Sequence, residues 1–184
     1  WGSVLDVYAL DSRGERYDGD YISQEQMDWL KAWLIETHST FKIILNSVPI
    51  TNMMGMYGPL AAGDRWDGYP HQRDELLEYI TDNEIEGVLW VAGDFHFSQL
   101  GRIAPEGQVG HDLWEVFAGP AGSFVNPIVW IAQENSQYRH ILKTYTYTLF
   151  EADPDAGSIR VKFINDDGDV LVEELLQLVA TPPK

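Results

Sequence analysis

An acid and an imidazole stand two residues apart, directly after an apolar segment. Residues 88–92 read Val-Leu-Trp-Val-Ala, which is typical of a buried strand, and Gly93, Asp94, Phe95 and His96 follow. On extended backbone, side chains at positions i and i+2 point to the same face, so Asp94 and His96 converge. Phe95 points the other way, into packing. A carboxylate and a neutral imidazole aimed together suit a metal ion or a general acid–base pair.

The short Asp-x-His pattern has a second interpretation. It is also typical of a turn acid beside a hydrogen-bonded histidine, and taken alone it favours that reading. The position in the fold therefore matters. In open α/β sheets, ligands bind beyond the carboxyl ends of the strands, which is where Asp94 and His96 are expected to lie.

A second strand ends in polar residues. Residues 41–49 form a continuous apolar run, which predicts a strand buried on both faces, with Asn46 and Ser47 at its end. Asn46 is either a carbonyl-type metal ligand or a turn residue before the step into Pro49. The local pattern favours the turn.

The elements that position these residues follow a strand–helix–strand rhythm. Residues 4–10 predict a strand, and Ser23 and Gln26 form a capping box that begins a helix reaching about residue 38. Trp29 and Trp33 widen the apolar stripe of that helix. This order, continued further along the chain, predicts a largely buried sheet of α/β type.

The middle of the chain contains a long irregular stretch. Residues 50–70 include Trp, Tyr and three Met, a composition too apolar for disorder, so we expect a folded loop over a site. A helix over about 71–83 follows and leads into the strand that ends before Asp94. Two further strands are expected at residues 99–103 and 114–119.

The last part of the chain differs from the rest in its residue pattern. Its β-branched and aromatic runs are separated by Asp-, Asn- and Gly-rich turns, which predicts an antiparallel β meander. The runs are residues 145–150, 159–163 and 170–173.

Composition narrows the class of protein. The 184 residues contain no cysteine, which excludes a disulfide framework and a thiolate metal site within the chain. A formal net charge of −17 disfavours a nucleic-acid backbone as partner and is compatible with multivalent cations. No apolar run reaches membrane-spanning length. The chain starts at Trp1, on the threshold of a buried strand, and we therefore expect a segment of something longer.

Several segments together resemble a known family. They are Leu10-Asp11-Ser12-Arg13, Gln26-x-x-Trp29-Leu30, Asp64-x-Trp66-Asp67-Gly68-Tyr69-Pro70-x-x-Arg73 and Gly93-Asp94-x-His96. Their order and approximate spacing resemble those of alkaline phosphatase D-like (PhoD-like) enzymes, members of the calcineurin-like metallophosphoesterase superfamily. The resemblance spans nearly the whole chain but only the C-terminal half of such an enzyme.

The resemblance implies a fold and a site. The fold is the C-terminal half of an α/β/β/α sandwich with a C-terminal antiparallel β meander: residues 1–140 are part of the metallophosphoesterase domain, and residues 141–180 extend it. The site holds two metal ions, with Asp94 and His96 as ligands, one toward each metal. Asn46 falls where other members place a His-x-Pro segment. Asp67, Arg73 and Arg13 resemble residues that shape the pocket or hold its loop.

The resemblance also implies cofactors and partners. The metals are divalent or mixed ions (Ca, Fe, Mn or Zn), the substrate is a phosphoester, and the location is secreted or periplasmic. The N-terminal motifs of the family, with the remaining ligands and a catalytic His, are absent from this sequence. Asp94 and His96 alone are too few ligands for a dinuclear site.

Three hypotheses remain open. The chain is the C-terminal part of a phosphomonoesterase or phosphodiesterase that is active only with its N-terminal half. It is a non-catalytic scaffold or binding domain that kept the fold and lost the site. Or a separate chain completes the site. The sequence preceding Trp1 discriminates between the first two.

Overall fold

The computed structural model describes residues 2–16, 19–52, 62–132 and 136–180. A six-stranded mixed sheet forms its centre, in the order β1-β2-β3-β5-β4-β6. The strands are β1 (Leu5–Ala9), β2 (Phe41–Asn46), β3 (Val88–Ala92), β4 (Ser98–Arg102), β5 (Trp114–Ala118) and β6 (Tyr138–Leu142). Strands β1, β2, β3 and β5 run parallel, and β4 and β6 complete the sheet in antiparallel pairings.

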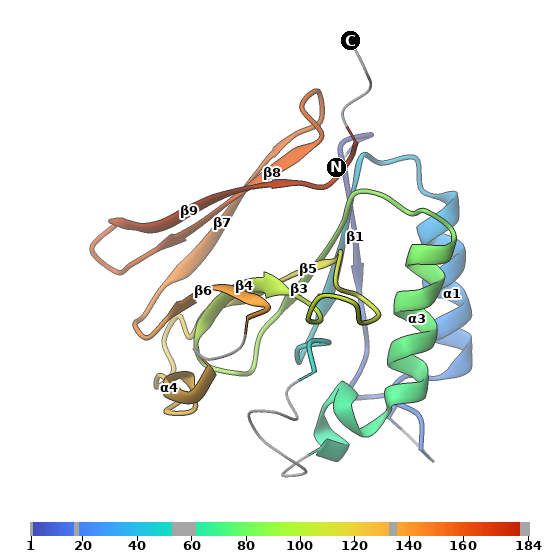
Figure 1. Ribbon diagram of the computed structural model, residues 1–184, viewed down its shortest axis with the longest axis horizontal. Helices are drawn as coiled ribbons and strands as arrows, with labels where there is room; N and C mark the ends of the chain where they lie inside the picture. Colours follow the sequence, from blue (N-terminus) through green and yellow to red (C-terminus); the bar gives the residue numbers. More distant parts are fainter. Residues whose placement is uncertain (1, 17–18, 53–61, 133–135, 181–184) are drawn as a thin grey trace.

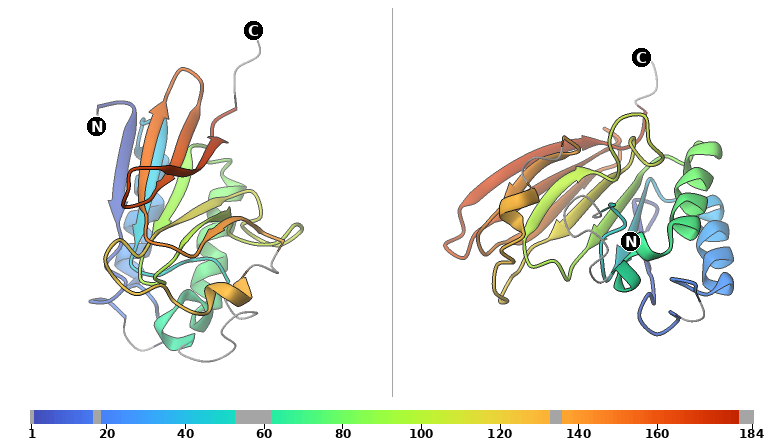
Figure 2. Two further views of the ribbon diagram at one scale, coloured as in Figure 1. Left: turned by 90° about the vertical axis from the view of Figure 1, so that its left-hand side faces the viewer. Right: turned by 60° about the horizontal axis from the view of Figure 1, so that its bottom comes forward.

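Two helices cover one face of this sheet. They are α1 (Gln24–Glu36) and α3 (Pro70–Asp82), which lie side by side in Figures 1 and 2. A short helix, α4 (Val129–Ala132), follows β5, and the segments Ala62–Asp64 and Trp66–Gly68 form single 3-10 turns before α3. Within the described ranges, no helix combines the length and apolarity needed to cross a membrane.

A second sheet covers part of the opposite face. It contains β7 (Tyr147–Asp153), β8 (Ser158–Ile164) and β9 (Val170–Gln177), paired antiparallel in that order. Alternate side chains of β8 and β9 pack against alternate side chains of β2, β3, β4 and β5, because successive residues of a strand face opposite sides. The described residues therefore form three layers: helices, mixed sheet and antiparallel sheet.

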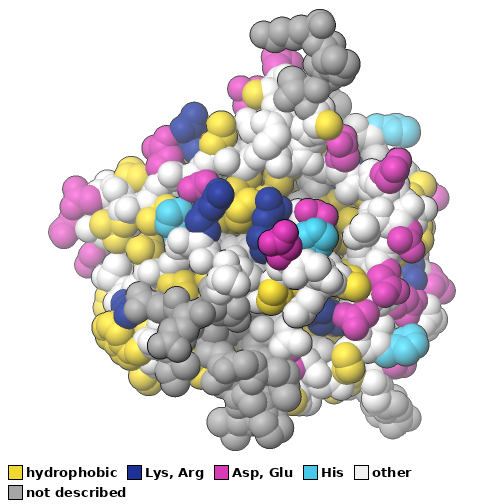
Figure 3. Space-filling model, in the orientation of Figure 1, with side chains coloured by type: hydrophobic (Ala, Val, Ile, Leu, Met, Phe, Trp, Pro, Cys, Tyr) yellow, Lys and Arg dark blue, Asp and Glu magenta, His cyan; other side chains and the backbone are white. Residues whose placement is uncertain are grey.

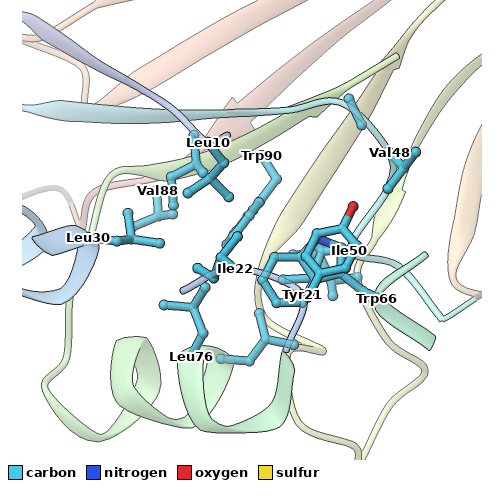
Figure 4. Close-up of a cluster of buried hydrophobic side chains, with 14 of the residues drawn as sticks. Leu10, Tyr21, Ile22, Leu30, Val48, Ile50, Trp66, Leu76, Val88 and Trp90 are labelled. Atoms are coloured by element: carbon cyan, nitrogen blue, oxygen red, sulfur yellow. The ribbon is translucent and has the colours of Figure 1, made fainter. Parts of the chain in front are cut away.

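The larger core lies between the helices and the first sheet. Leu30 of α1, Leu76 of α3 and Trp90 of β3 meet there (Figure 4), together with Trp66 from the second 3-10 turn. The indole rings of Trp66 and Trp90 meet edge to face with centroids 6.5 Å apart. Full burial of a large apolar side chain contributes roughly 1.5–3 kcal/mol, so this cluster anchors both helices to the sheet.

Helix α1 begins as expected but differs in two respects. The Ser23 hydroxyl accepts a hydrogen bond from the Gln26 amide N–H, so the N-cap is confirmed. The Gln26 side chain does not return to Ser23, as a capping box requires. Its Oε1 accepts from the Asp11 N–H, and its amide group donates to the Glu15 carboxylate. The helix ends at Glu36, and Trp29 is 72% exposed rather than part of the buried stripe.

Other expectations need correction. The second strand ends at Asn46 and is not buried on both faces. Leu45 shares a face with Phe41 and Ile43, but it lies on the part that the second sheet does not cover and is 39% exposed. Strand β6 was not expected, because residues 138–142 alternate irregularly between polar and apolar types. The loop expected over residues 50–70 lies partly outside the described residues.

Candidate functional site

The segment after β3 is a bend and not extended backbone. The strand ends at Ala92, and both Asp94 (φ 67°) and His96 (φ 58°) adopt the left-handed region. The expectation that two side chains converge because of strand alternation is therefore wrong. Left-handed backbone at non-glycine residues is costly, and it persists where packing imposes it, commonly at functional sites.

Packing of Phe95 explains how the bend is held. Phe95 is buried between Asp94 and His96, and its ring contacts those of Phe97 and Phe117 at centroid distances of 6.4 and 5.9 Å. The expectation that Phe95 points into packing is confirmed. The aromatic contacts anchor the centre of the bend, while Asp94 stays exposed and His96 half-buried on either side.

His96 is oriented by the segment that follows β5. The imidazole Nδ1 lies 3.2 Å from the Ser123 hydroxyl, and the ring meets that of Phe124 edge to face, with centroids 4.7 Å apart. The His96 carbonyl accepts a hydrogen bond from the Asn126 amide at 3.0 Å. With Nδ1 engaged, Nε2 is the nitrogen left for a ligand. Sequence reasoning missed these partners, whose only signal was the turn of small residues at 119–124.

Arg13 joins Asp94 to a second acid. The guanidinium Nη2 lies 3.3 Å from Asp94 Oδ1, and Nη1 donates to Asp64 Oδ1 at 2.9 Å. Arg16 also donates to Asp64. These four side chains come from the loops after β1 and β3 and from the 3-10 turn Ala62–Asp64, so the site is assembled from segments far apart in the sequence.

Asn46 occupies the end of β2, in register with Ala92 of β3. It is buried, and neither amide atom has a hydrogen-bond partner in the described part of the chain. A buried amide without partners is costly, and at the carboxyl end of β2, in register with Ala92, that of Asn46 is available to a ligand or ion. The Asn46 side chain makes no hydrogen bond to the bend that follows it at residues 47–48 in the described part of the chain. The neighbouring Ser47 hydroxyl lies 2.6 Å from that of Ser12.

The Asp67 and Arg73 side chains are buried. The Asp67 carboxylate lies 3.5 Å from Arg65 Nε, and both side chains are almost fully covered. Arg73 Nε donates to the Ile50 carbonyl at 2.8 Å, and Nη1 donates to Asp74. These contacts join Asp67 to Arg65 and tie α3 to the segment that follows β2.

The donor set for a metal is small in the described ranges. No group of three or more His, Asp or Glu side chains there is placed to hold an ion. Asp94 and His96 provide one carboxylate and one imidazole, and Asn46 adds a buried amide. Acidic side chains are otherwise spread over the surface, as the face drawn in Figure 3 illustrates.

Comparison with known proteins identifies the family. The family model described as PhoD-like phosphatase matches residues 1–167. The chain belongs to the PhoD-like phosphatase family. It is 25% identical over 84 residues to alkaline phosphatase D of Bacillus subtilis (strain 168), a match that covers 45% of this chain and 14% of that protein.

A solved structure shares the fold of this PhoD-like chain. The structure described as that of PhoD superposes with a TM-score of 0.69 at 16% identity, over 96% of this chain and 39% of the other. The chain thus spans well under half the length of the relatives it matches.

Proposed function

We propose that this chain is part of a metal-dependent phosphoric ester hydrolase, with Asp94 and His96 as metal ligands. Membership of the PhoD-like family supports phosphoester chemistry. The observation that carries the site is the strained bend at the carboxyl end of β3, which holds an exposed carboxylate and a half-buried imidazole on left-handed backbone. Strain of this kind gathers where geometry serves a ligand.

The residues present fit part of a metal site. An Asp94 oxygen, the His96 Nε2 and the unpartnered amide oxygen of Asn46 are donors that hard and borderline divalent ions accept. The Ser123 hydroxyl at Nδ1 fixes the ring so that Nε2 is presented. A bound divalent ion would polarise a phosphoryl oxygen and lower the pKa of a bound water. Three donors are too few for two ions, so further ligands come from another segment.

Arg13 is suited to the substrate. Its guanidinium is half-exposed beside Asp94 and is held in place by Asp64. A planar guanidinium can donate two parallel hydrogen bonds to phosphoryl oxygens, a geometry that Lys cannot reproduce. Arg13 would orient the phosphoryl group next to the ion. Asp67 and Arg73 would hold the surrounding loop.

The partner that completes the site is the N-terminal half of the same enzyme, or a chain that replaces it. Strand β1 is the edge of the first sheet in the described residues. The apolar side chains of Val7 on β1 and Leu45 on β2 are exposed there. An open cleft of about 540 Å³ runs along this edge and includes Trp29. Added strands and helices there would complete an α/β/β/α sandwich, with residues 1–140 in the main domain and 141–180 as its extension.

The proposal is tested on the full-length protein and the isolated chain together. Hydrolysis of an aryl phosphate and of an aryl phosphodiester is measured with added Ca, Fe, Mn or Zn, alongside metal content. We expect activity from the full-length protein, and loss of metal and at least about a hundredfold loss of turnover in Asp94→Asn and His96→Asn. His111→Gln, at a partly exposed histidine elsewhere, is the matched control. A metal-free, inactive full-length protein would reject the proposal in favour of a scaffold.

A further inference from the structure

A buried carboxylate lies under the segment that leaves β2. Glu115 of β5 is 1% exposed, and its two oxygens accept hydrogen bonds from the amide N–H groups of Ile50 and Thr51, each at 2.9 Å. These amides belong to neither a helix nor a strand, so without Glu115 they would be buried donors without partners. A carboxylate bonded to two amides forms charge-assisted hydrogen bonds, which are stronger than neutral ones.

Arg73 holds the same segment from the other side. Its Nε donates to the Ile50 carbonyl at 2.8 Å, while Glu115 accepts from the Ile50 N–H. Both polar groups of one residue are therefore bonded to oppositely charged side chains, one from α3 and one from β5. The Ile50 side chain is fully buried in the main core (Figure 4), so the segment is fixed by packing as well.

This segment connects directly to the candidate site. Ser47 precedes it, and the Ser47 hydroxyl lies 2.6 Å from that of Ser12. Ser12 is followed by Arg13, which reaches Asp94. Residues 47–51 are thus anchored at one end by Ser12 and at the other by Glu115, with Asn46 immediately before them.

We propose that Glu115 is a positioning residue of the site: with Arg73 it clamps residues 50–51 and thereby holds Asn46, Ser47 and Arg13 in register with Asp94. In this role Glu115 acts through the Ile50 and Thr51 amides and not by contact with substrate or ion. The part that concerns turnover rests on the proposed function, whereas the clamp rests on its own contacts.

The cost of burying the Glu115 carboxyl group agrees with a role in holding residues 50–51. Burial raises its pKa to about 7, against the opposing effect of its hydrogen bonds and the positive charge of Arg73. Its register partners on the adjacent strands, Trp90 and Gly101, carry no charge. A neutral side chain would avoid this cost of burial. The carboxylate offers a separate oxygen to each of the two amides, whereas a Gln side chain has one oxygen and an NH₂ donor.

The clamp is tested by exchange of the amides that it holds. Hydrogen–deuterium exchange on peptides covering residues 47–52 is followed in the full-length protein, in Glu115→Gln and in Gln99→Met. Gln99 is the matched control, since it is buried on the adjacent strand β4 and its amide atoms have no hydrogen-bond partner in the described residues. We expect protection to fall about tenfold in Glu115→Gln, because an amide retains one acceptor and turns a donor toward the second N–H. Gln99→Met should keep wild-type protection.

Kinetics separate positioning from simple stability. We expect Glu115→Gln to lower kcat about tenfold, with KM changed less than about twofold, because displaced site residues affect the reacting geometry more than binding. Arg73→Lys, which keeps a charged donor for the Ile50 carbonyl, should retain more activity than Arg73→Met.

The outcomes distinguish the two proposals. An inactive wild-type protein in which Glu115→Gln still releases residues 47–52 overturns the proposed function and supports the clamp. Unchanged protection and unchanged kcat in Glu115→Gln overturn the clamp. If Glu115→Gln does not fold, the comparison of Arg73→Lys with Arg73→Met tests the clamp. Equal protection of residues 47–52 in these two variants would overturn the clamp.

Discussion

The Arg13 guanidinium and the Asp94 carboxylate face each other across two loops, with Nη2 3.3 Å from Oδ1, although 80 positions separate them in the chain. Arg13 is held in this place by Asp64, which also binds Arg16. A cation that binds Asp94 therefore binds next to a fixed positive charge. The pairing of Arg13 with Asp94 therefore predicts in which direction metal affinity and turnover change when Arg13 is replaced, and the two can be measured separately.

Arg13→Gln should change metal affinity and turnover in opposite directions. Removing a half-exposed positive charge beside Asp94 should tighten metal binding by less than about fivefold, since exposed charge pairs contribute little. The same change removes a donor for phosphoryl oxygens and should lower kcat/KM at least about tenfold. Metal titration and steady-state kinetics of the full-length protein check both. The control is Arg139→Gln, at an arginine paired with Glu174 away from the site. Weaker metal binding in Arg13→Gln would contradict this account.

Relief of backbone strain should stabilise the fold at the expense of the site. His96 has a φ of 58°, which glycine adopts without penalty. We expect His96→Gly to raise the free energy of unfolding by about 1 kcal/mol, less what the Phe124 contact contributes, while abolishing metal binding. Urea unfolding measures the stability. His96→Val should instead destabilise by more than about 1 kcal/mol, because a β-branched side chain resists left-handed backbone. Equal stability of the two variants would show that the bend is unstrained.

The buried Glu115 should make stability depend on pH. Its pKa is raised from 4.5 to about 7, so the folded state binds a proton more tightly than the unfolded state. The stabilisation linked to that proton is complete below pH 4.5 and is lost as pH rises toward 7. We expect the free energy of unfolding of the wild type to fall by roughly 3 kcal/mol across this window relative to Glu115→Gln. Parallel urea titrations at pH 4.5 and pH 8 measure the difference, and identical slopes with pH would refute the assignment.

The exposed apolar side chain of Leu45, on the strand next to β1, can be used to test whether a partner segment covers this face. Leu45 is 39% exposed on the face that the second sheet leaves open. In the isolated chain, Leu45→Lys should change stability by less than about 0.5 kcal/mol, as most surface substitutions do. In the full-length protein the same change should cost about 2 kcal/mol or more, because it would bury a charge. Ile35→Lys, at an exposed position on α1, is the control for both. A similar effect of Leu45→Lys in the two proteins would argue against coverage of this face.

Local patterns predicted most of the elements. The apolar runs of β2, β3 and β5, the capped, periodic stretch of α1 and the periodic stretch of α3 carry their own signals, because strand and helix spacing are set by backbone geometry within a few residues. Strand β6 carried no such signal, and its place beside β4 depends on pairing with residues at least 37 positions earlier, as in the pair of Tyr138 with Gly101.

The sequence by itself predicted which residues could carry chemistry, and it determined that Phe95 belongs in the core, since residue types and apolar periodicity are local properties. Only the tertiary structure decided how the site is built: the left-handed bend at Asp94 and His96, the Ser123 hydroxyl at the imidazole, the bridge from Arg13 to Asp94, and the bonds from Glu115 to Ile50 and Thr51. Each of these joins segments distant in the chain or depends on a backbone conformation imposed by packing. Spacing along the sequence carries no information on either.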